Sequence, residues 1–288
     1  MTEPKTFTLD APGAVLHYDV REGEDGGDEP ALLLIGSPMA APGFATLASH
    51  FPERRVVTYD PRGSERSRRT DGGAESTPVE HADDLRRVIE AVGGPVDVFA
   101  SSGGAVNALV LVAEHPELVR TLVAHEPPAA SALPDREAAN AAMLDIHGTY
   151  LASGFGPAMA KFFALVSHDG PFNDEYLAQP APDPAAFGLP TEDDGSRDDA
   201  LLGQNMRTCG AHEHHFKALR AAPTRIVVAV GADSGDTFAA RGGRAVAERI
   251  GVEARLFPGD HGAFLGGEYG QTGKPDEFAA TLRAVLAS

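Results

Sequence analysis

The stretch VDVFASSGGAV, residues 96–106, carries the strongest signal for the fold of this chain. Its first part, residues 96–100, is mostly apolar and predicts a buried strand, and residues 104–113 predict a helix. The chain therefore turns from strand to helix within the three residues SSG. In a nucleophile elbow, such a turn holds a serine hydroxyl above the sheet and needs small residues two positions before and two after the serine.

Ser102 fits this pattern, since Ala100 and Gly104 stand at the two flanking positions. Ser101 does not fit, because Phe99 stands two positions before it. A flexible Gly/Ser loop is the alternative, but a loop is not normally held between two apolar elements without a linker. We therefore predict that Ser102 is a nucleophile on an elbow.

Outside this stretch, short apolar runs alternate with longer helical patterns, which is typical of a mostly parallel, twisted sheet with helices on both faces. The predicted fold class is therefore α/β. The predicted strands, of which the first two can form an antiparallel hairpin, are residues 6–10, 14–20, 31–36, 55–59, 96–100, 121–126, 225–231 and 254–257. The predicted helices are residues 79–92, 104–115, 237–250 and 275–287, with Gly93 and Gly251 as stop signals.

The alternation stops at residues 131–221, which read as helices with Phe, Tyr and Met positions and no convincing strand. We interpret this interval as an inserted helical cap between two parts of one core, residues 1–130 and 222–288. Its aromatic and Met content suggests an apolar substrate, although the same residues could simply form the core of a helical lobe. Residues 179–199 are rich in Pro, Asp and Gly and predict a mobile surface loop, and the acidic residues 22–29 predict a solvated turn.

The composition limits the classes of partner. The chain has 288 residues, 42% of them hydrophobic, which is enough for a large core. Its formal net charge of -18 repels nucleic acid and anionic lipid surfaces, so neither is an expected partner. Cys209 is the single cysteine, and the N-terminus lacks a basic-then-apolar signal, so a cytoplasmic location is expected. No apolar run is long enough to predict a membrane span.

Four motifs can be read together: LLLIGSPM (32–39), YDPRGSERS (59–67), FASSGGAV (99–106) and FPGDHGAF (257–264). They are similar to the oxyanion loop, the D-x-R-G-x-G-x-S stretch, the elbow and the catalytic-histidine loop of the α/β-hydrolase family, which the chain resembles over nearly its whole length. Two departures from the family pattern are Ile35, where His usually stands, and Glu65, where a second Gly usually stands.

A serine hydroxyl needs a base, and His261 is the predicted one, because the resemblance places the catalytic histidine in the Gly-flanked loop after the last strand. Asp260 is expected to stabilise that loop, since adjacent side chains diverge. The competing cluster HEHH, residues 212–215, could suggest a metal, with His212 and His215 on one helix face. No further ligands follow at a recognised spacing, so we predict a solvated helix there, and no metal or other cofactor.

Two strand ends could supply the acid that orients His261. Asp233 and Asp236 follow the strand after which most family members carry the acid, but the usual position falls on Ser234, one residue beyond Asp233. Glu126 ends an earlier strand and precedes two prolines that would hold the turn rigid.

The alternative role of Glu126 is a surface carboxylate at a strand end. A branch of the family that includes zearalenone-type lactone hydrolases takes its acid from this strand, and ASSGGA followed by HEPP is similar to that branch. We therefore rank Glu126 ahead of Asp233.

An oxyanion hole needs two backbone N–H groups that point at the developing negative charge. Gly103, directly after the serine, would supply one, and the resemblance implies Ser37 for the other. Pro38 has no N–H and would stiffen the loop. The alternative interpretation of GSP, residues 36–38, is a simple turn.

Together these residues predict a serine hydrolase that cleaves a small carboxylic ester or lactone through an acyl-enzyme. The alternative is a small-molecule binder, or a biosynthetic enzyme that uses the same pocket for a non-hydrolytic step. The sequence leaves a homo-oligomer open and does not identify the substrate.

Overall fold

The computed structural model describes residues 3–24, 29–73 and 75–288, and within these ranges nine strands form one sheet. The strands are β1 (Lys5–Ala11), β2 (Ala14–Arg21), β3 (Leu32–Ile35), β4 (Val56–Asp60), β5 (Arg68–Arg69), β6 (Val96–Ser101), β7 (Val119–His125), β8 (Arg225–Gly231) and β9 (Arg255–Phe257). Their order across the sheet is β1-β2-β4-β3-β6-β7-β8-β9, with β5 paired to β2.

The sheet is parallel from β4 through β9, and β1 and β2 form an antiparallel edge. The central strands β3 and β6 are buried at every position, as expected for parallel strands covered on both faces. All parallel strands end at the same edge of the sheet, so the residues that follow them are brought together there.

The α-helices are α1 (Ala45–Ser49), α2 (Pro78–Val92), α3 (Gly103–Glu114), α4 (Arg136–Ser153), α5 (Phe155–Ser167), α6 (Asp174–Leu177), α7 (Met206–Gly210), α8 (Phe216–Ala221), α9 (Phe238–Ile250) and α10 (Pro275–Leu286). The shorter helices are η1 (Ala41–Phe44), η2 (Pro116–Leu118), η3 (Ala130–Ala132), η4 (Pro184–Phe187), the π-helix η5 (Ala200–Asn205) and η6 (Glu268–Gly270).

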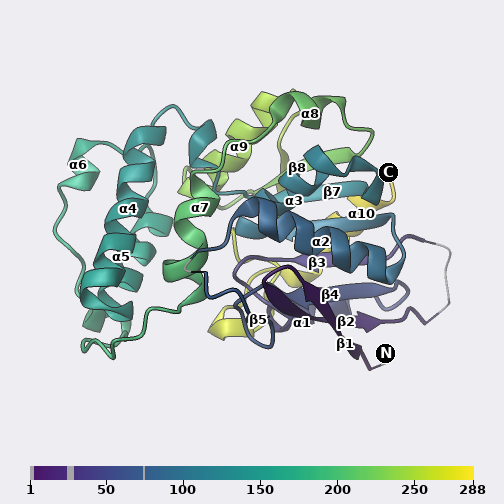
Figure 1. Cartoon of the computed structure of the whole chain (residues 1–288). Helices are drawn as coiled ribbons and strands as arrows, with labels where there is room; N and C mark the ends of the chain where they lie inside the picture. The colour runs from purple at the N-terminus through teal and green to yellow at the C-terminus, as the bar shows by residue number, and fades with distance from the viewer. Residues whose placement is uncertain (1–2, 25–28, 74) are drawn as a thin grey trace.

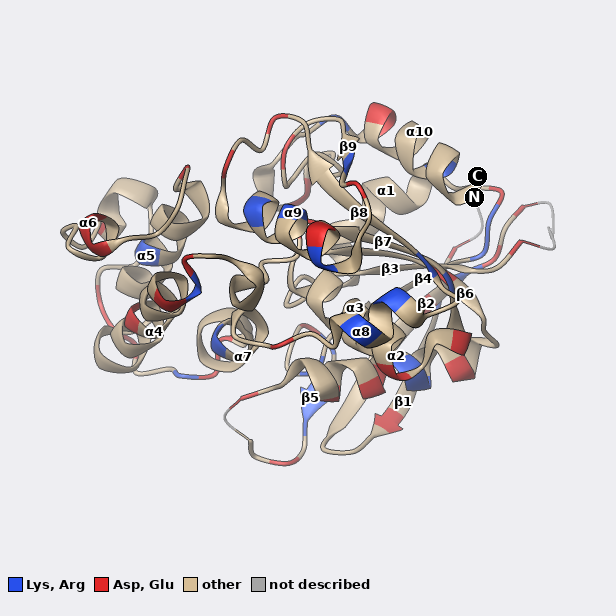
Figure 2. Ribbon diagram, turned by 90° about the horizontal axis from the view of Figure 1, so that it is seen from above, with Lys and Arg blue, Asp and Glu red and all other residues tan. Residues whose placement is uncertain are grey.

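Two apolar layers cover the sheet. Figure 2 shows α1 and α10 on one side of the strands and α2, α3 and α8 on the other. One core cluster joins side chains of α2, α3 and α9 to the sheet, and a second joins α1 and α10 to its opposite face.

Local sequence explains where the longest covering helix begins and ends. Thr77 and Glu80 form a capping box at the start of α2, and Gly93 ends it with φ 84°. Gly251 ends α9 in the same left-handed conformation, with φ 80°.

Helices α4 to α7 lie together at one end of the sheet (Figure 1). They have their own apolar cluster, which includes Met143, Tyr150 and Leu202 and also Phe238 of α9. Within residues 131–221 the structure contains helices and loops but no named strand. We refer to this interval as the helical segment.

The predicted α/β class and mostly parallel sheet are confirmed. The two-residue strand β5 was not predicted, because two arginines carry no apolar signal.

Residues 179–199 are mostly exposed and include η4, and their mobility remains a prediction. Four residues of the predicted acidic turn, 25–28, lie outside the described ranges. No helix in the described part of the chain has the length and apolar character that a membrane span requires.

Candidate active site

Ser102 lies at a sharp turn between β6 and α3. Its backbone has φ 57° and ψ -129°, a conformation that non-glycine residues rarely adopt. The Ser102 N–H donates a hydrogen bond of 3.0 Å to the carbonyl oxygen of His125, which ties the turn to β7. A side chain on Gly104 would meet Gly36 Cα and Ile35 O, each at 2.8 Å, so the following helix can approach β3 only with glycine there.

Glu126 and His261 meet although they are far apart in the sequence. His261 Nδ1 lies 2.6 Å from Glu126 Oε2, and the other carboxylate oxygen, Oε1, accepts a hydrogen bond of 2.8 Å from the Gly231 N–H. Glu126 directly follows β7 and has φ 47°, another left-handed non-glycine backbone. Its side chain is fully buried, whereas the His261 side chain is 44% exposed. Both carboxylate oxygens of Glu126 are therefore used to hold this arrangement.

The environment keeps Glu126 ionised. Burial by itself raises the pKa of the Glu126 carboxyl, but the hydrogen bond with His261 and the charge of His261 outweigh it and bring the pKa down to about 2. A negative charge therefore stands behind His261 at neutral pH, where it would stabilise a proton on that ring.

The other candidate carboxylates have different partners. Asp233 accepts a hydrogen bond of 2.6 Å from Lys274 Nζ, and both side chains are exposed. Asp236 pairs with Arg244 at 3.0 Å. Asp260 accepts a bond of 3.0 Å from the Gly262 N–H within its own loop. The structure thus brings Glu126, and none of these three aspartates, into hydrogen-bond distance of His261.

Ser37 and Gly103, the predicted oxyanion donors, lie side by side. A side chain on Gly103 would come within 2.5 Å of Ser37 O, so glycine is needed for this close approach. Gly103 is the first residue of α3, where backbone N–H groups have no partner within the helix.

Ser37, Ser102, Gly103 and His261 all line one cavity of about 720 Å³. Most of its wall is apolar: the helical segment supplies Met143, Phe162, Phe163, Leu165, Val166, Leu201 and Met206, and the core supplies Met39, Phe238, Phe264 and Leu265. Among the described residues that line it, Asp233 and Asp260 are the carboxylates, and there is no Lys or Arg.

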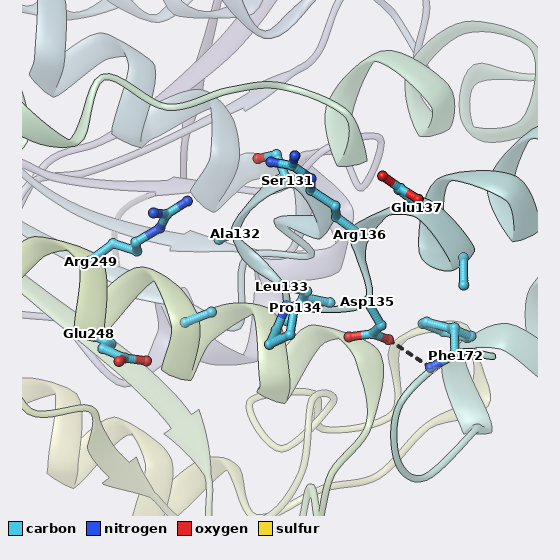
Figure 3. A pocket seen from close by; sticks show the side chains of 12 residues that line it. Ser131, Ala132, Leu133, Pro134, Asp135, Arg136, Glu137, Phe172, Glu248 and Arg249 are labelled. Atoms are coloured by element: carbon cyan, nitrogen blue, oxygen red, sulfur yellow. Dashed lines mark hydrogen bonds between the residues drawn. The ribbon is translucent and has the colours of Figure 1, made fainter.

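A second hollow of about 690 Å³ lies between η3, the start of α4 and α9 (Figure 3). It is lined by charged side chains such as Arg136 and Glu248, and Asp135 there accepts a hydrogen bond of 2.7 Å from the Phe172 N–H. None of the predicted site residues lines it. We therefore locate the candidate active site in the cavity beside Ser102.

The prediction of a solvated helix at residues 212–215 is wrong. These residues form a loop between α7 and α8, and His214 is buried with a pKa lowered to about 3 by burial and by the charges of His212 and His215. Helix α7 ends at Gly210 and α8 begins only at Phe216. The expected helix face shared by His212 and His215 therefore does not form. No group of three possible metal ligands is present in the described ranges.

Sequence reasoning missed two residues at the site. Ser234, at the position where the usual family acid would stand, is buried and lines the cavity. His125 stacks on His261, with ring centroids 5.7 Å apart. Its position directly before Glu126 was the available signal.

Glu65 shows how the chain accommodates a departure from the family pattern. It has φ 46°, which is the left-handed region that favours glycine. At Glu65 the chain therefore adopts a backbone conformation that glycine would tolerate without strain, at some cost for a residue with a side chain.

Comparison with known proteins identifies the family. A model described as the alpha/beta hydrolase fold matches residues 30–202. A curated relative, the uncharacterized hydrolase YraK of Bacillus subtilis (strain 168), is 41% identical over 124 residues, which is 42% of this chain and 44% of that relative, so the match spans less than half the relative's length.

Solved structures are similar over nearly the whole chain. A carboxylesterase of the Thaumarchaeon Nitrososphaera gargenis has a TM-score of 0.66 at 19% identity, covering 97% of both chains. The enol-lactonase from Burkholderia xenovorans LB400 has a TM-score of 0.65 at 16% identity, covering 98% of this chain and 100% of that one. At these identities the likeness shows the fold. Because the family model matches more than half of the 288 residues, the chain belongs to the α/β hydrolase fold family.

Proposed function

We propose that this protein is a serine hydrolase that cleaves a neutral carboxylic ester or lactone through an acyl-enzyme on Ser102. The observation that carries the proposal is the hydrogen bond of 2.6 Å between His261 Nδ1 and the buried Glu126, in a cavity that both His261 and Ser102 line. A carboxylate on Nδ1 leaves Nε2 of the neutral ring as the proton acceptor, which is the form a general base needs.

The proposed reaction has two halves. Ser102 Oγ attacks the ester carbonyl while His261 takes the serine proton, and the N–H groups of Ser37 and Gly103 stabilise the oxyanion. His261 then gives that proton to the departing alkoxide, which leaves an acyl group on Ser102. A water molecule, deprotonated by His261, then attacks the acyl carbonyl. The bond between the acyl carbon and Ser102 Oγ breaks, His261 returns the proton to Oγ, and the carboxylic acid is released.

The cavity wall favours an uncharged, apolar substrate. It is mostly apolar, and no cavity-lining Lys or Arg in the described ranges would neutralise an anionic group. The helical segment supplies most of this apolar wall, so we propose that it acts as the cap that sets selectivity. The similarity to zearalenone-type lactone hydrolases remains part of the proposal and is supported by the position of Glu126 after β7.

A covalent probe and an ester assay test the proposal together. A fluorophosphonate should add once, at Ser102, and a short p-nitrophenyl ester should give a burst of p-nitrophenol followed by turnover. Ser102→Ala should lose both signals. Ser131→Ala is the control, since this hydroxyl bonds His212 O away from the cavity and should leave both signals intact. Stoichiometric ligand binding without turnover by the unchanged protein would contradict the proposal and support a binding role.

A pair of substrates with matched chain length and different charge tests the substrate class. p-Nitrophenyl hexanoate and the mono-p-nitrophenyl ester of adipic acid have similar chains, but the second ends in a carboxylate. We expect kcat/KM to be at least about tenfold higher for the neutral ester, because the apolar wall would desolvate the carboxylate without pairing it. Equal values would exclude the neutral-substrate part of the proposal and leave the acyl-enzyme untouched.

A further inference from the structure

His125 occupies an unusual position beneath the proposed base. It is the last residue of β7, directly before Glu126, and its side chain is fully buried. Its ring stacks on the ring of His261 with the centroids 5.7 Å apart and an angle of 21° between the planes. His261 is thus held at its edge by Glu126 and on one face by His125.

The same imidazole also reaches the elbow. His125 Nδ1 lies 3.1 Å from the hydroxyl oxygen of Ser101, within hydrogen-bond distance. Ser101 is the last residue of β6, is buried, and directly precedes Ser102. His125 therefore connects the strand that carries the nucleophile to the ring of the base.

The surroundings keep His125 uncharged. Four aromatic rings pack around it, those of Phe99, Phe257, Phe264 and Phe278, with centroid distances from 5.3 to 6.5 Å. Burial lowers the pKa of His125 to about 3, and the charges that act on it are those of Glu126, which opposes the shift, and His261, which adds to it. Among the described atoms its Nε2 has no hydrogen-bond partner. A ring in this state can neither take nor give the reaction's proton at neutral pH.

We propose that His125 is a positioning residue for the serine hydrolase reaction: its neutral ring orients His261 toward Ser102 and stabilises the imidazolium that forms there. This inference rests on the proposed function. The face of a neutral aromatic ring attracts a cation within about 6 Å of its centroid. The proton passes from Ser102 to His261 and on to the leaving group, and His125 gains and loses none.

Two substitutions separate the stacked face from the hydrogen bond. His125→Phe keeps a flat ring under His261 and loses the bond to Ser101. His125→Leu loses both but still fits an apolar site. We expect His125→Leu to lower kcat about tenfold at nearly unchanged KM, which corresponds to about 1.4 kcal/mol. We expect His125→Phe to retain most of the rate, within about threefold.

The pH dependence of kcat/KM separates a positioning role of His125 from a packing role, because a loss of packing alone would not change it. The acid limb of kcat/KM reports protonation of the essential base. Without the stacked face the imidazolium is less stable, so the limb of His125→Leu should move to lower pH by about one unit, and His125→Phe should restore it. The matched control is Phe278→Leu, which removes a ring that packs on His125 at 5.3 Å but leaves the His125–His261 pair in place. It should lower the thermal midpoint and leave kcat and the acid limb unchanged.

All variants are also labelled with a fluorophosphonate after their thermal midpoints are measured, so that only folded protein is compared. An unlabelled parent protein would overturn the proposed function itself. A labelled parent with the same kcat, labelling rate and acid limb in His125→Leu would overturn the role of His125 alone. Equal shifts in Phe278→Leu and His125→Leu would also overturn it, since general packing would then explain both.

Discussion

The edge of the sheet and the helical segment shape the same cavity in different ways. At the sheet edge the backbone is forced into left-handed conformations, with φ 57° at Ser102 and 47° at Glu126, and buried hydrogen bonds fix the side chains. The helical segment reaches the cavity through half-buried apolar side chains such as Phe162 and Phe163. Under the proposed function, we expect the reaction chemistry to depend on the sheet edge and the choice of substrate to depend on the helical segment.

The physical reason is the difference between directional and non-directional contacts. A buried charge that orients a ring cannot be replaced by a neighbour, so its loss removes a step of the reaction. An apolar wall contributes to the binding free energy of the substrate roughly in proportion to the area it covers. A lost methylene contact weakens that binding by only about 1–3 kcal/mol.

The largest expected effect is at Glu126. Glu126→Gln should lower kcat by about 10⁴-fold, or about 5.5 kcal/mol, because a neutral amide neither holds the His261 tautomer nor stabilises the imidazolium. Asp233→Asn removes only an exposed pair with Lys274 and should cost at most about tenfold. Steady-state kinetics with a p-nitrophenyl ester measure both.

Both proteins must first give a native thermal transition, since a buried carboxylate can also support the fold. An inactive Asp233→Asn beside an active Glu126→Gln would move the acid to the end of β8. Large losses in both would require the double variant, to find whether the two carboxylates act as one unit.

An intermediate effect is expected on stability in the helical segment. The folded-state pKa of His214 is about 3, below the ordinary value of 6.5, so its contribution is complete above pH 6.5 and is lost as the pH falls toward 3. At pH 5 the unfolded chain gains about 2 kcal/mol from protonating this residue. His214→Phe should therefore reduce the fall in the free energy of unfolding between pH 7.5 and 5 by about 2 kcal/mol.

Urea unfolding at the two pH values measures this slope. His115→Gln, at an exposed histidine, is the control and should keep the parent slope. If both variants behave like the parent, the burial of His214 does not contribute to acid sensitivity.

The smallest expected effect is on substrate ranking. Phe162→Ala removes a ring from the cavity wall on α5 (Phe155–Ser167), so an ester with a bulky aryl group in its acyl part would lose apolar contact. Its kcat/KM should fall about tenfold relative to that of an acetate ester. Leu144→Ala, on the exposed side of α4, should leave the ranking unchanged. A panel of esters with one leaving group measures it. Equal losses for every ester would mark Phe162 as structural core and weaken the contrast between the two regions.

Much of the fold could be predicted because strong local signals coincide with the elements that form. The apolar runs predicted every strand except β5, and the glycines at 93 and 251 marked helix ends that the structure shows. The elbow at Ser102 could also be predicted, because its small neighbours and the change from strand to helix lie next to each other in the chain.

Other features could not be predicted from residues that are close together in the sequence. Residues 212–215 form a loop where the sequence predicts a helix, because polar periodicity alone does not reveal that α7 ends at Gly210. His214 packs on the rings of His212 and Phe216 and is buried, whereas His212 is half-buried and His215 is exposed, a difference that the spacing of the histidines does not encode.

The α/β class and the elbow at Ser102 follow from the sequence alone, because each depends on neighbours within a few positions, and the family resemblance added His261. Which carboxylate lies beside His261 depends on contacts between strands that are distant in the sequence. Glu126 and Asp233 both follow parallel strands and both precede His261 in the chain, so only the packing of β7 against β8 buries one and leaves the other exposed to Lys274. The same is true of His125, which lies next to Glu126 in the sequence but acquires its place between Ser101 and His261 only when β6, β7 and the loop after β9 come together.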